Sequence, residues 1–236
     1  MSELDMLDLS TFFRALEGID YVLVKMSDSF PVYTQGSDLD MYCRTPSAAS
    51  RAIVAVANAY IDGVRRLEVT EKPEKHKTII DLCRGANLEL RFEVFSALPR
   101  YRSIELKDWY FRTVLDRSTT RAIQTPKGER FTVRVPHEVD DAVLRYVEFL
   151  EWYETRSDKV KHLDYVLSKL ETELSRDRFL DTLHYYTRIP DNAKGTAFAN
   201  SHFYNKYVRE IVYQALRVKQ LGVRRTVTRL VRGRKR

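Results

Sequence analysis

Two aspartates lie two positions apart in the stretch QGSDLDMYC, residues 35–43, and their type and spacing are suited to metal chemistry. The rest of the stretch reads as a strand, although aspartate is among the poorest strand formers. Alternate side chains of a strand share a face, so Asp38 and Asp40 would present two carboxylates about 7 Å apart while Leu39 and Met41 point into the core. Carboxylate oxygens suit Mg²⁺ or Mn²⁺, and a pair of such ions can clamp a polyphosphate and activate an attacking oxygen.

The surrounding elements must hold this pair in place. Short runs bounded by turn residues predict strands over 21–25, 38–43, 64–69, 76–83 and 88–96. A helix capped by Thr45 or Ser47 is predicted to run to about Asp62, between the second and third of these strands. The RGAN sequence predicts a tight antiparallel hairpin between the last two strands. The expected fold class is α+β, a mixed sheet with flanking helices, followed by a helical bundle lobe.

The pattern becomes almost wholly helical near residue 136. Apolar residues at helical spacing predict antiparallel helices over 139–153 and 160–174, with Ser157 as an N-cap, and a further pair over 177–187 and 202–220. Three parts are expected: a catalytic lobe over 1–135, a helical lobe over 136–222 and a basic tail over 223–236.

The order of these elements resembles the DNA polymerase beta-like nucleotidyltransferase superfamily. Members have a strand that ends in a turn with a serine, then Asp-x-Asp on the next strand, and a third carboxylate on a later strand. Here the turn is KMSDS with Ser27, eleven positions before Asp38, and Asp81 in HKTIIDLC takes the third place. The resemblance covers about residues 20–96. Met26 stands where the family normally has glycine before the serine.

The resemblance implies a two-metal site built by Asp38, Asp40 and Asp81, with Mg²⁺ or Mn²⁺ as cofactor. Glu93 competes with Asp81 for the third position, since both lie on the predicted hairpin. Strand order favours Asp81, which we expect to lie closest to the pair on a strand adjacent to theirs. Glu93 would then support a metal ligand or act as the acceptor base. The expected nucleotide- or phosphate-binding residues are Lys25, Ser27, Ser37, Arg145 and Lys159. Simpler readings stay open, because a turn serine often satisfies backbone groups and basic residues are common on solvated helix faces.

The net charge of +7 is unevenly distributed. Residues 204–236 hold eleven Lys or Arg and one Glu, a balance of +10, which leaves about −3 for the rest. This segment reads as amphipathic helices suited to an anionic membrane surface or an acidic partner. RNA binding is less favoured, and a helix packed on the protein is an equal alternative.

The N-terminus MSELDMLDLS is acidic where a secretory signal would be basic, and Cys43 and Cys83 lack the spacing of a disulfide framework. We therefore expect a cytoplasmic protein, peripheral to the inner face of the membrane if the tail binds lipid.

Three function classes follow. The leading one is a metal-dependent nucleotidyltransferase that uses a nucleoside triphosphate and a small-molecule, sugar or surface-polysaccharide-precursor acceptor. A non-catalytic nucleotide-binding or regulatory protein with the same fold is the alternative that Met26 favours. A nucleotide-sugar glycosyltransferase also uses Asp-x-Asp, but normally after a nucleotide-binding lobe of roughly a hundred residues, and only 37 residues precede Asp38 here.

Overall fold

The computed structural model of the chain describes residues 6–62, 65–153, 155–172 and 174–189. The predictions for 202–220 and for the basic tail over 223–236 lie outside these ranges. Contacts divide the described residues into two units: one comprises residues up to 99 together with 107–141, and the other comprises 100–106 and the residues from 142 onward. Each unit is described by itself.

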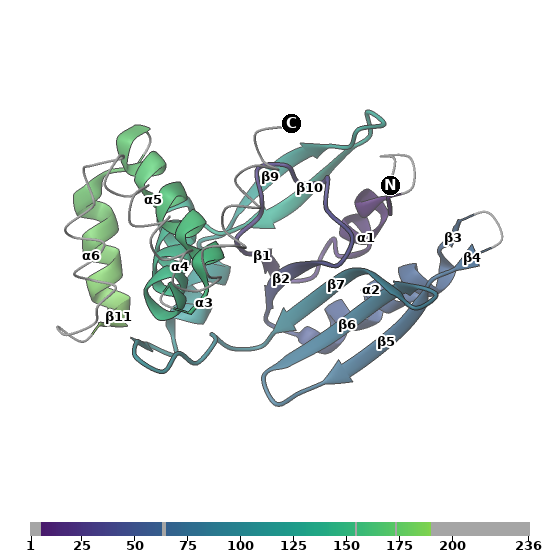
Figure 1. The fold of residues 1–236 in the computed structure, drawn as a ribbon, viewed down its shortest axis with the longest axis horizontal. Helices are drawn as coiled ribbons and strands as arrows, with labels where there is room; N and C mark the ends of the chain where they lie inside the picture. Colours follow the sequence, from purple (N-terminus) through teal and green to yellow (C-terminus); the bar gives the residue numbers. More distant parts are fainter. Residues whose placement is uncertain (1–5, 63–64, 154, 173, 190–236) are drawn as a thin grey trace, which may run out of the picture. The chain divides into compact units, whose positions relative to one another are not determined.

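A five-stranded mixed sheet forms the centre of the first unit (Figure 1). Its strands are β1 (Tyr21–Leu23), β2 (Ser37–Cys43), β5 (Glu68–Pro73), β6 (Lys77–Arg84) and β7 (Asn87–Phe95). They lie in the order β1-β2-β7-β6-β5, with β2 parallel to β7 and all other neighbours antiparallel. The expected α+β class with a mixed sheet is confirmed.

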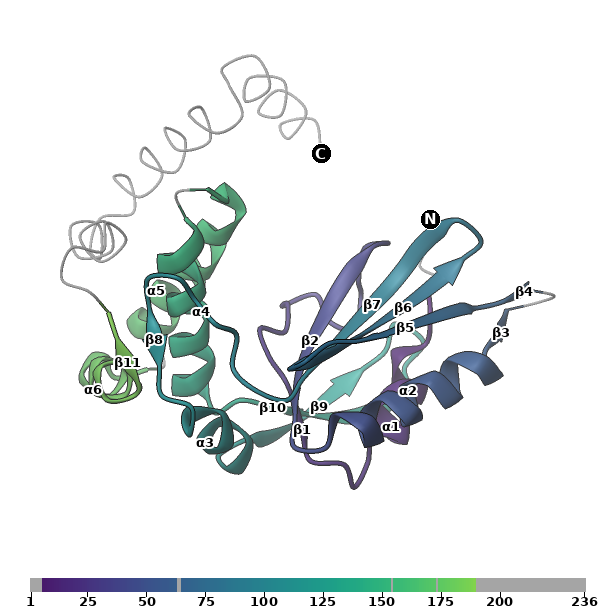
Figure 2. The same ribbon diagram turned by 90° about the horizontal axis from the view of Figure 1, so that it is seen from below.

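Two helices, α1 (Leu9–Ala15) and α2 (Pro46–Ala59), cover one face of this sheet, as Figure 2 shows. The Asp8 side chain caps α1 by accepting the amide of Ser10 at 2.9 Å, and Pro46 begins α2, where its missing N–H costs nothing. The core between helices and sheet is apolar, and its fully buried members include Phe12, Met41, Ile53, Ile80, Leu90 and Phe92. The opposite face of the sheet carries the alternate residues, among them Asp38, Asp40, Arg91 and Glu93.

Two local expectations need correction. The strand expected over 64–69 instead begins at Glu68 as β5, after a short ribbon of β3 (Ile61–Asp62) and β4 (Arg65–Arg66). The final strand of the hairpin, β7, also pairs with β2, so the strand next to the Asp-x-Asp strand is β7 and not β6. The helix and hairpin predictions are confirmed, with α2 ending at Ala59.

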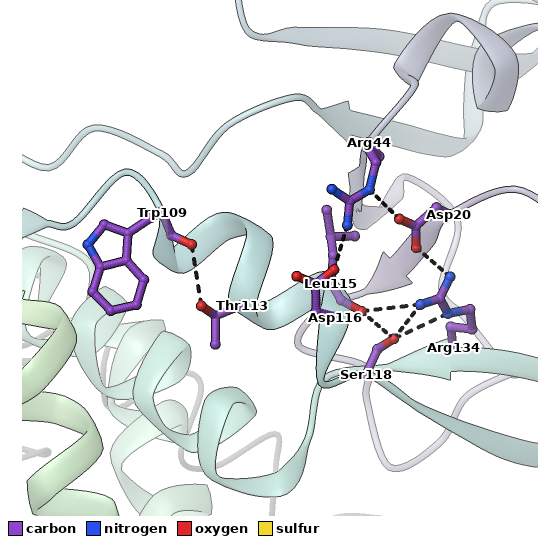
Figure 3. Close-up of polar contacts among 8 residues, drawn as sticks. All are labelled: Asp20, Arg44, Trp109, Thr113, Leu115, Asp116, Ser118 and Arg134. Atoms are coloured by element: carbon purple, nitrogen blue, oxygen red, sulfur yellow. Dashed lines mark hydrogen bonds and ion pairs between the residues drawn. The ribbon is translucent and has the colours of Figure 1, made fainter.

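The first unit is completed by α3 (Tyr110–Asp116) and a hairpin of β9 (Thr119–Gln124) and β10 (Arg130–Val135). Arg134 joins this hairpin to the start of β1 and the end of α3 (Figure 3): its guanidinium donates to Asp20 at 2.5 Å, to Ser118 Oγ at 2.7 Å and to the Leu115 carbonyl at 3.2 Å. Arg44, just after β2, donates to the other Asp20 oxygen at 2.6 Å. This network fixes the start of β1 and the end of β2.

Replacing Arg134 with Met should lower the free energy of unfolding by about 1–2 kcal/mol, because it removes charge-assisted hydrogen bonds and leaves a carbonyl and a hydroxyl with fewer donors. The Asp20 carboxylate keeps its contact with Arg44, which limits the loss. Urea unfolding of the full chain measures the effect. The matched control is Arg121→Met, an exposed arginine on the partner strand of the same hairpin. Equal losses in both variants would show that the network adds no stability.

The second unit is helical, with α4 (Glu138–Trp152) entering it from the first and followed by α5 (Val160–Thr172) and α6 (Arg176–Tyr186). A 3-10 turn, η2 (Ser157–Lys159), precedes α5, and β8 (Glu105–Leu106) pairs with β11 (Thr187–Arg188). The three helices agree with those predicted over 139–153, 160–174 and 177–187. Within the described ranges, no helix has both the length and the apolar character needed to cross a membrane.

Candidate active site

Asp38 and Asp40 lie near the beginning of β2, on the sheet face that α1 and α2 leave uncovered. Leu39 packs on the core and Met41 is fully buried in it, so strand alternation directs the two aspartates away from the core, as the sequence indicated. Asp38 is exposed, and the Asp40 side chain keeps 19% of its surface accessible. Farther along β2, Tyr42 packs against Phe111 of α3, with ring centroids 5.3 Å apart. The open part of this face is therefore the part that carries the aspartates.

The strand beside β2 contributes a third carboxylate. In the parallel β2–β7 register, Asp40 is the partner of Glu93 and Asp38 is the partner of Arg91. Residues directly across from one another on neighbouring strands share a face. Glu93 therefore joins the aspartates on the uncovered face, where its half-buried carboxylate also accepts a hydrogen bond from the Lys77 ammonium at 3.3 Å.

Asp81 lies one strand farther from the pair, on β6, which corrects the expectation that its strand adjoins theirs. Both of its carboxylate oxygens are engaged: Oδ1 accepts from Arg91 Nε at 2.6 Å and Oδ2 from Lys72 Nζ at 2.9 Å. The hydrogen bond from Arg91 is the main cause that lowers the pKa of Asp81, and it outweighs the opposing effect of burial. Asp81 thus has the surroundings of a structural ion-pair residue.

This lowered pKa makes Asp81 a source of acid sensitivity. A carboxyl group whose pKa is lower in the folded than in the unfolded protein stabilises the fold above the unfolded pKa of about 3.9, and that contribution is lost as the pH falls through the folded value. We expect Asp81→Asn to lower the free energy of unfolding at about pH 7 and to have a progressively smaller effect as the pH falls below about 3.9. Urea titrations of both proteins across this range measure the difference. A difference that stays constant with pH would contradict the assignment.

Lys25 follows β1 and has a left-handed backbone, with a φ of 55° that non-glycine residues rarely adopt. Its ammonium lies 2.6 Å from Asp40 Oδ2, and both side chains are 19% exposed. Its backbone amide donates to Asp141 Oδ1 at 3.3 Å. The unusual backbone conformation of the turn after β1 therefore occurs at Lys25, one residue before Met26.

The two predicted serines differ in surroundings. Ser27 is exposed in the turn after Lys25, and its hydroxyl lies 3.1 Å from that of Ser29. Ser37 begins β2 and closes the preceding turn, because its Oγ accepts the amide of Thr34 at 3.2 Å. Strand alternation also places Ser37 on the opposite face from Asp38. Of these two serines, only Ser27 belongs to the turn whose Lys25 contacts Asp40.

Arg145 and Lys159 are both buried in the second unit. Lys159 forms an ion pair with Glu148, and the guanidinium of Arg145 lies 4.1 Å from the centroid of the Tyr165 ring, a cation–π distance. His162 Nε2 lies 4.0 Å from the same Glu148 carboxylate. Each of these two predicted residues therefore has a partner within the helical unit: Glu148 for Lys159 and Tyr165 for Arg145.

The chemistry of Asp38 and Asp40 fits a divalent cation, because both offer carboxylate oxygens on one partly exposed face. Asp81 does not fit, since both of its oxygens already accept from cations. In the part of the chain that the structure describes, no group of three or more His, Cys, Asp or Glu side chains is placed to hold a metal. A third ligand would require a side chain to change its conformation. Glu93 is suited to this, because it lies directly across from Asp40 on the neighbouring strand.

Sequence reasoning missed the cations of this face. These are Lys72, Lys77 and Arg91, which alternate with the acids across β5, β6 and β7. Also missed was Asp141 of α4, whose carboxylate accepts the backbone amide of Lys25. The alternating charges in HKTIIDLCRGANLELRFEV were a usable signal, since cross-strand partners in a hairpin are often of opposite charge. No comparable pattern marks Asp141, which lies 116 positions from Lys25.

Comparison with known proteins adds little at the level of sequence. No family model matches the chain, and no curated protein matches it. Among solved structures, one described as a "putative nucleotidyltransferase from H. pylori" matches 89% of this chain and 92% of its own, with 12% sequence identity and a TM-score of 0.31.

Proposed function

We propose that the chain is a metal-dependent nucleotidyltransferase that uses a nucleoside triphosphate and a small-molecule, sugar or glycan-precursor acceptor. One observation carries the proposal: β2 and β7 run parallel in a register that puts Asp38, Asp40 and Glu93 on the same uncovered face. A sheet face that carries these three carboxylates, beside a turn with hydroxyl groups, is suited to a triphosphate that arrives with divalent cations.

The roles follow from position. Asp38 and Asp40 would hold Mg²⁺ or Mn²⁺, which when bound supplies charge neutralisation at the donor phosphates and lowers the pKa of the acceptor hydroxyl. Glu93 would accept the acceptor's proton from the neighbouring strand. The acceptor oxygen forms a bond to the α-phosphorus as the bond to the bridging oxygen breaks, and pyrophosphate leaves. Ser27 and the amides of its turn would orient the outer phosphates.

The test is a panel of the four ribonucleoside triphosphates with Mg²⁺ or Mn²⁺ and candidate acceptors, in which released pyrophosphate and the mass of the modified acceptor are both measured. Pyrophosphate without an acceptor adduct indicates hydrolysis, so both products are needed. Loss of product on chelation of the metal supports the proposal, and transfer that persists in excess chelator would overturn its metal-dependent part.

A second candidate is a nucleotide-binding protein without catalysis, which the Lys25–Asp40 ion pair favours, because an ammonium already neutralises one of the two aspartates. Such a protein would bind a triphosphate, measurable by calorimetry, and release no pyrophosphate with any acceptor.

A further inference from the structure

Lys25 is held in a strained position by two separate contacts. Its φ of 55° is a left-handed backbone, which is unfavourable for a non-glycine residue. The amide of Lys25 donates to Asp141 Oδ1 at 3.3 Å, and its ammonium lies 2.6 Å from Asp40 Oδ2. The preceding residue, Val24, donates its amide to the Asp40 carbonyl at 2.9 Å, so the backbone on both sides of the contact is fixed. The turn is therefore arranged to place this ammonium on Asp40.

The ammonium and a divalent cation would compete for the same carboxylate. Two cations cannot both approach one oxygen closely without strong repulsion, and the Lys25–Asp40 pair is sheltered enough that solvent screens it only partly. Lys25 also lies two residues from Ser27, so an ammonium released from Asp40 is already next to the turn with the hydroxyl groups.

We propose that Lys25 is a displaceable counter-cation that couples metal binding to triphosphate binding, an inference that rests on the proposed function. Without metal the ammonium neutralises Asp40. Metal takes this oxygen, and the released ammonium pairs with the outer phosphates of the donor. Asp141 is a positioning residue that holds the left-handed backbone from which Lys25 reaches both.

The first experiment measures metal binding without catalysis, by electron paramagnetic resonance of Mn²⁺ with the full-length protein. Lys25→Met should bind Mn²⁺ about tenfold more tightly than wild type, since a charge-assisted hydrogen bond no longer has to be broken. Lys25→Gly serves as a second variant, because glycine adopts a positive φ without strain and also lacks the ammonium. Lys25→Arg keeps the charge and should resemble wild type.

The second measurement uses inorganic tripolyphosphate with saturating Mg²⁺ as a probe of the phosphate site. Lys25→Met and Lys25→Gly should bind it about tenfold more weakly than wild type, while their Mn²⁺ affinity rises. A lysine with only a structural role would not move the two affinities in opposite directions. Unchanged or weaker Mn²⁺ binding in both variants would overturn the inference.

Asp40→Asn separates this inference from the proposed function. If wild type binds Mn²⁺ and Asp40→Asn does not, the metal site is supported. The Lys25 variants then test only whether Lys25 acts as the counter-cation. If Asp40→Asn binds Mn²⁺ as wild type does, the metal site fails and the counter-cation fails with it.

The positioning role of Asp141 is tested by a double-mutant cycle. Asp141→Ala should lower the thermal midpoint of the wild-type protein but have a smaller effect in the Lys25→Gly background, where the backbone no longer needs to be held. Asp141→Asn retains an acceptor oxygen and should rescue most of the loss. An equal loss in both backgrounds would assign Asp141 to other contacts of α4 and remove it from the proposal.

Discussion

Replacing Asp40 with Asn should reduce nucleotidyl transfer by about a thousandfold or more, the loss expected when a ligand of a catalytic divalent ion is neutralised. Asp38→Asn should have an effect of the same order, because the two carboxylates share one face of β2 and would act on the same ions. The measurements are pyrophosphate release and Mn²⁺ binding, which should fall together.

The two variants should differ in stability. Asp38 is exposed, lies next to another carboxylate and is directly across from Arg91, so its neutralisation removes a repulsion and an attraction together and should leave the free energy of unfolding nearly unchanged. Asp40→Asn also loses the ion pair with Lys25, which should cost about 1–2 kcal/mol because the pair is partly sheltered from solvent. Asp28→Asn, an exposed carboxylate in the preceding turn, is the matched control and should retain full activity. Wild-type activity in Asp38→Asn and Asp40→Asn would contradict the proposed function.

Local patterns were sufficient to predict the strand that carries these aspartates. A single alternation, with Leu39 and Met41 inward and Asp38 and Asp40 outward, determines both the strand and its polar face. Helix α2 was predictable for a similar reason, because its apolar residues repeat at helical spacing after a proline that suits a first turn.

The pairing of strands far apart in the chain was not predictable in this way. The two-residue turn between Arg84 and Asn87 alone would pair Asp81 with Leu90. A register shift between Leu82 and Cys83 instead pairs Asp81 with Arg91, which turns a candidate metal ligand into the partner of an arginine. Likewise, nothing in the hairpin sequence indicates which of its strands pairs with β2.

The left-handed conformation of Lys25 also could not be predicted from the spacing of apolar and polar residues. The sequence drew attention to Met26, because the superfamily that it resembles normally has glycine at that position, whereas the positive φ occurs at Lys25. That backbone is stabilised by Asp141, a residue from a different element far along the chain. Contacts of this kind depend on the finished fold, since no local preference of a lysine favours a left-handed conformation.

Glu93 and Asp81 give the sharpest test of the site, because both are acids on one hairpin. Only Glu93 lies on the strand next to β2, directly across from Asp40. Glu93→Gln should reduce transfer by at least about a hundredfold, the contribution typical of a general base, with little change in stability. Asp81→Asn should do the reverse: it should cost about 1–2 kcal/mol of stability near neutral pH, because Arg91 and Lys72 lose their charged partner, and should leave transfer within a few-fold of wild type.

The pH dependence of transfer adds a readout that a structural role would not change. If Glu93 accepts the proton, Glu93→Gln should change the shape of the pH–rate profile as well as the rate. Asp81→Asn should retain the wild-type profile, because both Asp81 oxygens are held in ion pairs with Arg91 and Lys72 and take no part in the proton transfer. If Asp81→Asn instead loses both activity and Mn²⁺ binding while Glu93→Gln keeps them, the ion pairs with Arg91 and Lys72 must open in the active protein, and the third carboxylate would be the one on β6.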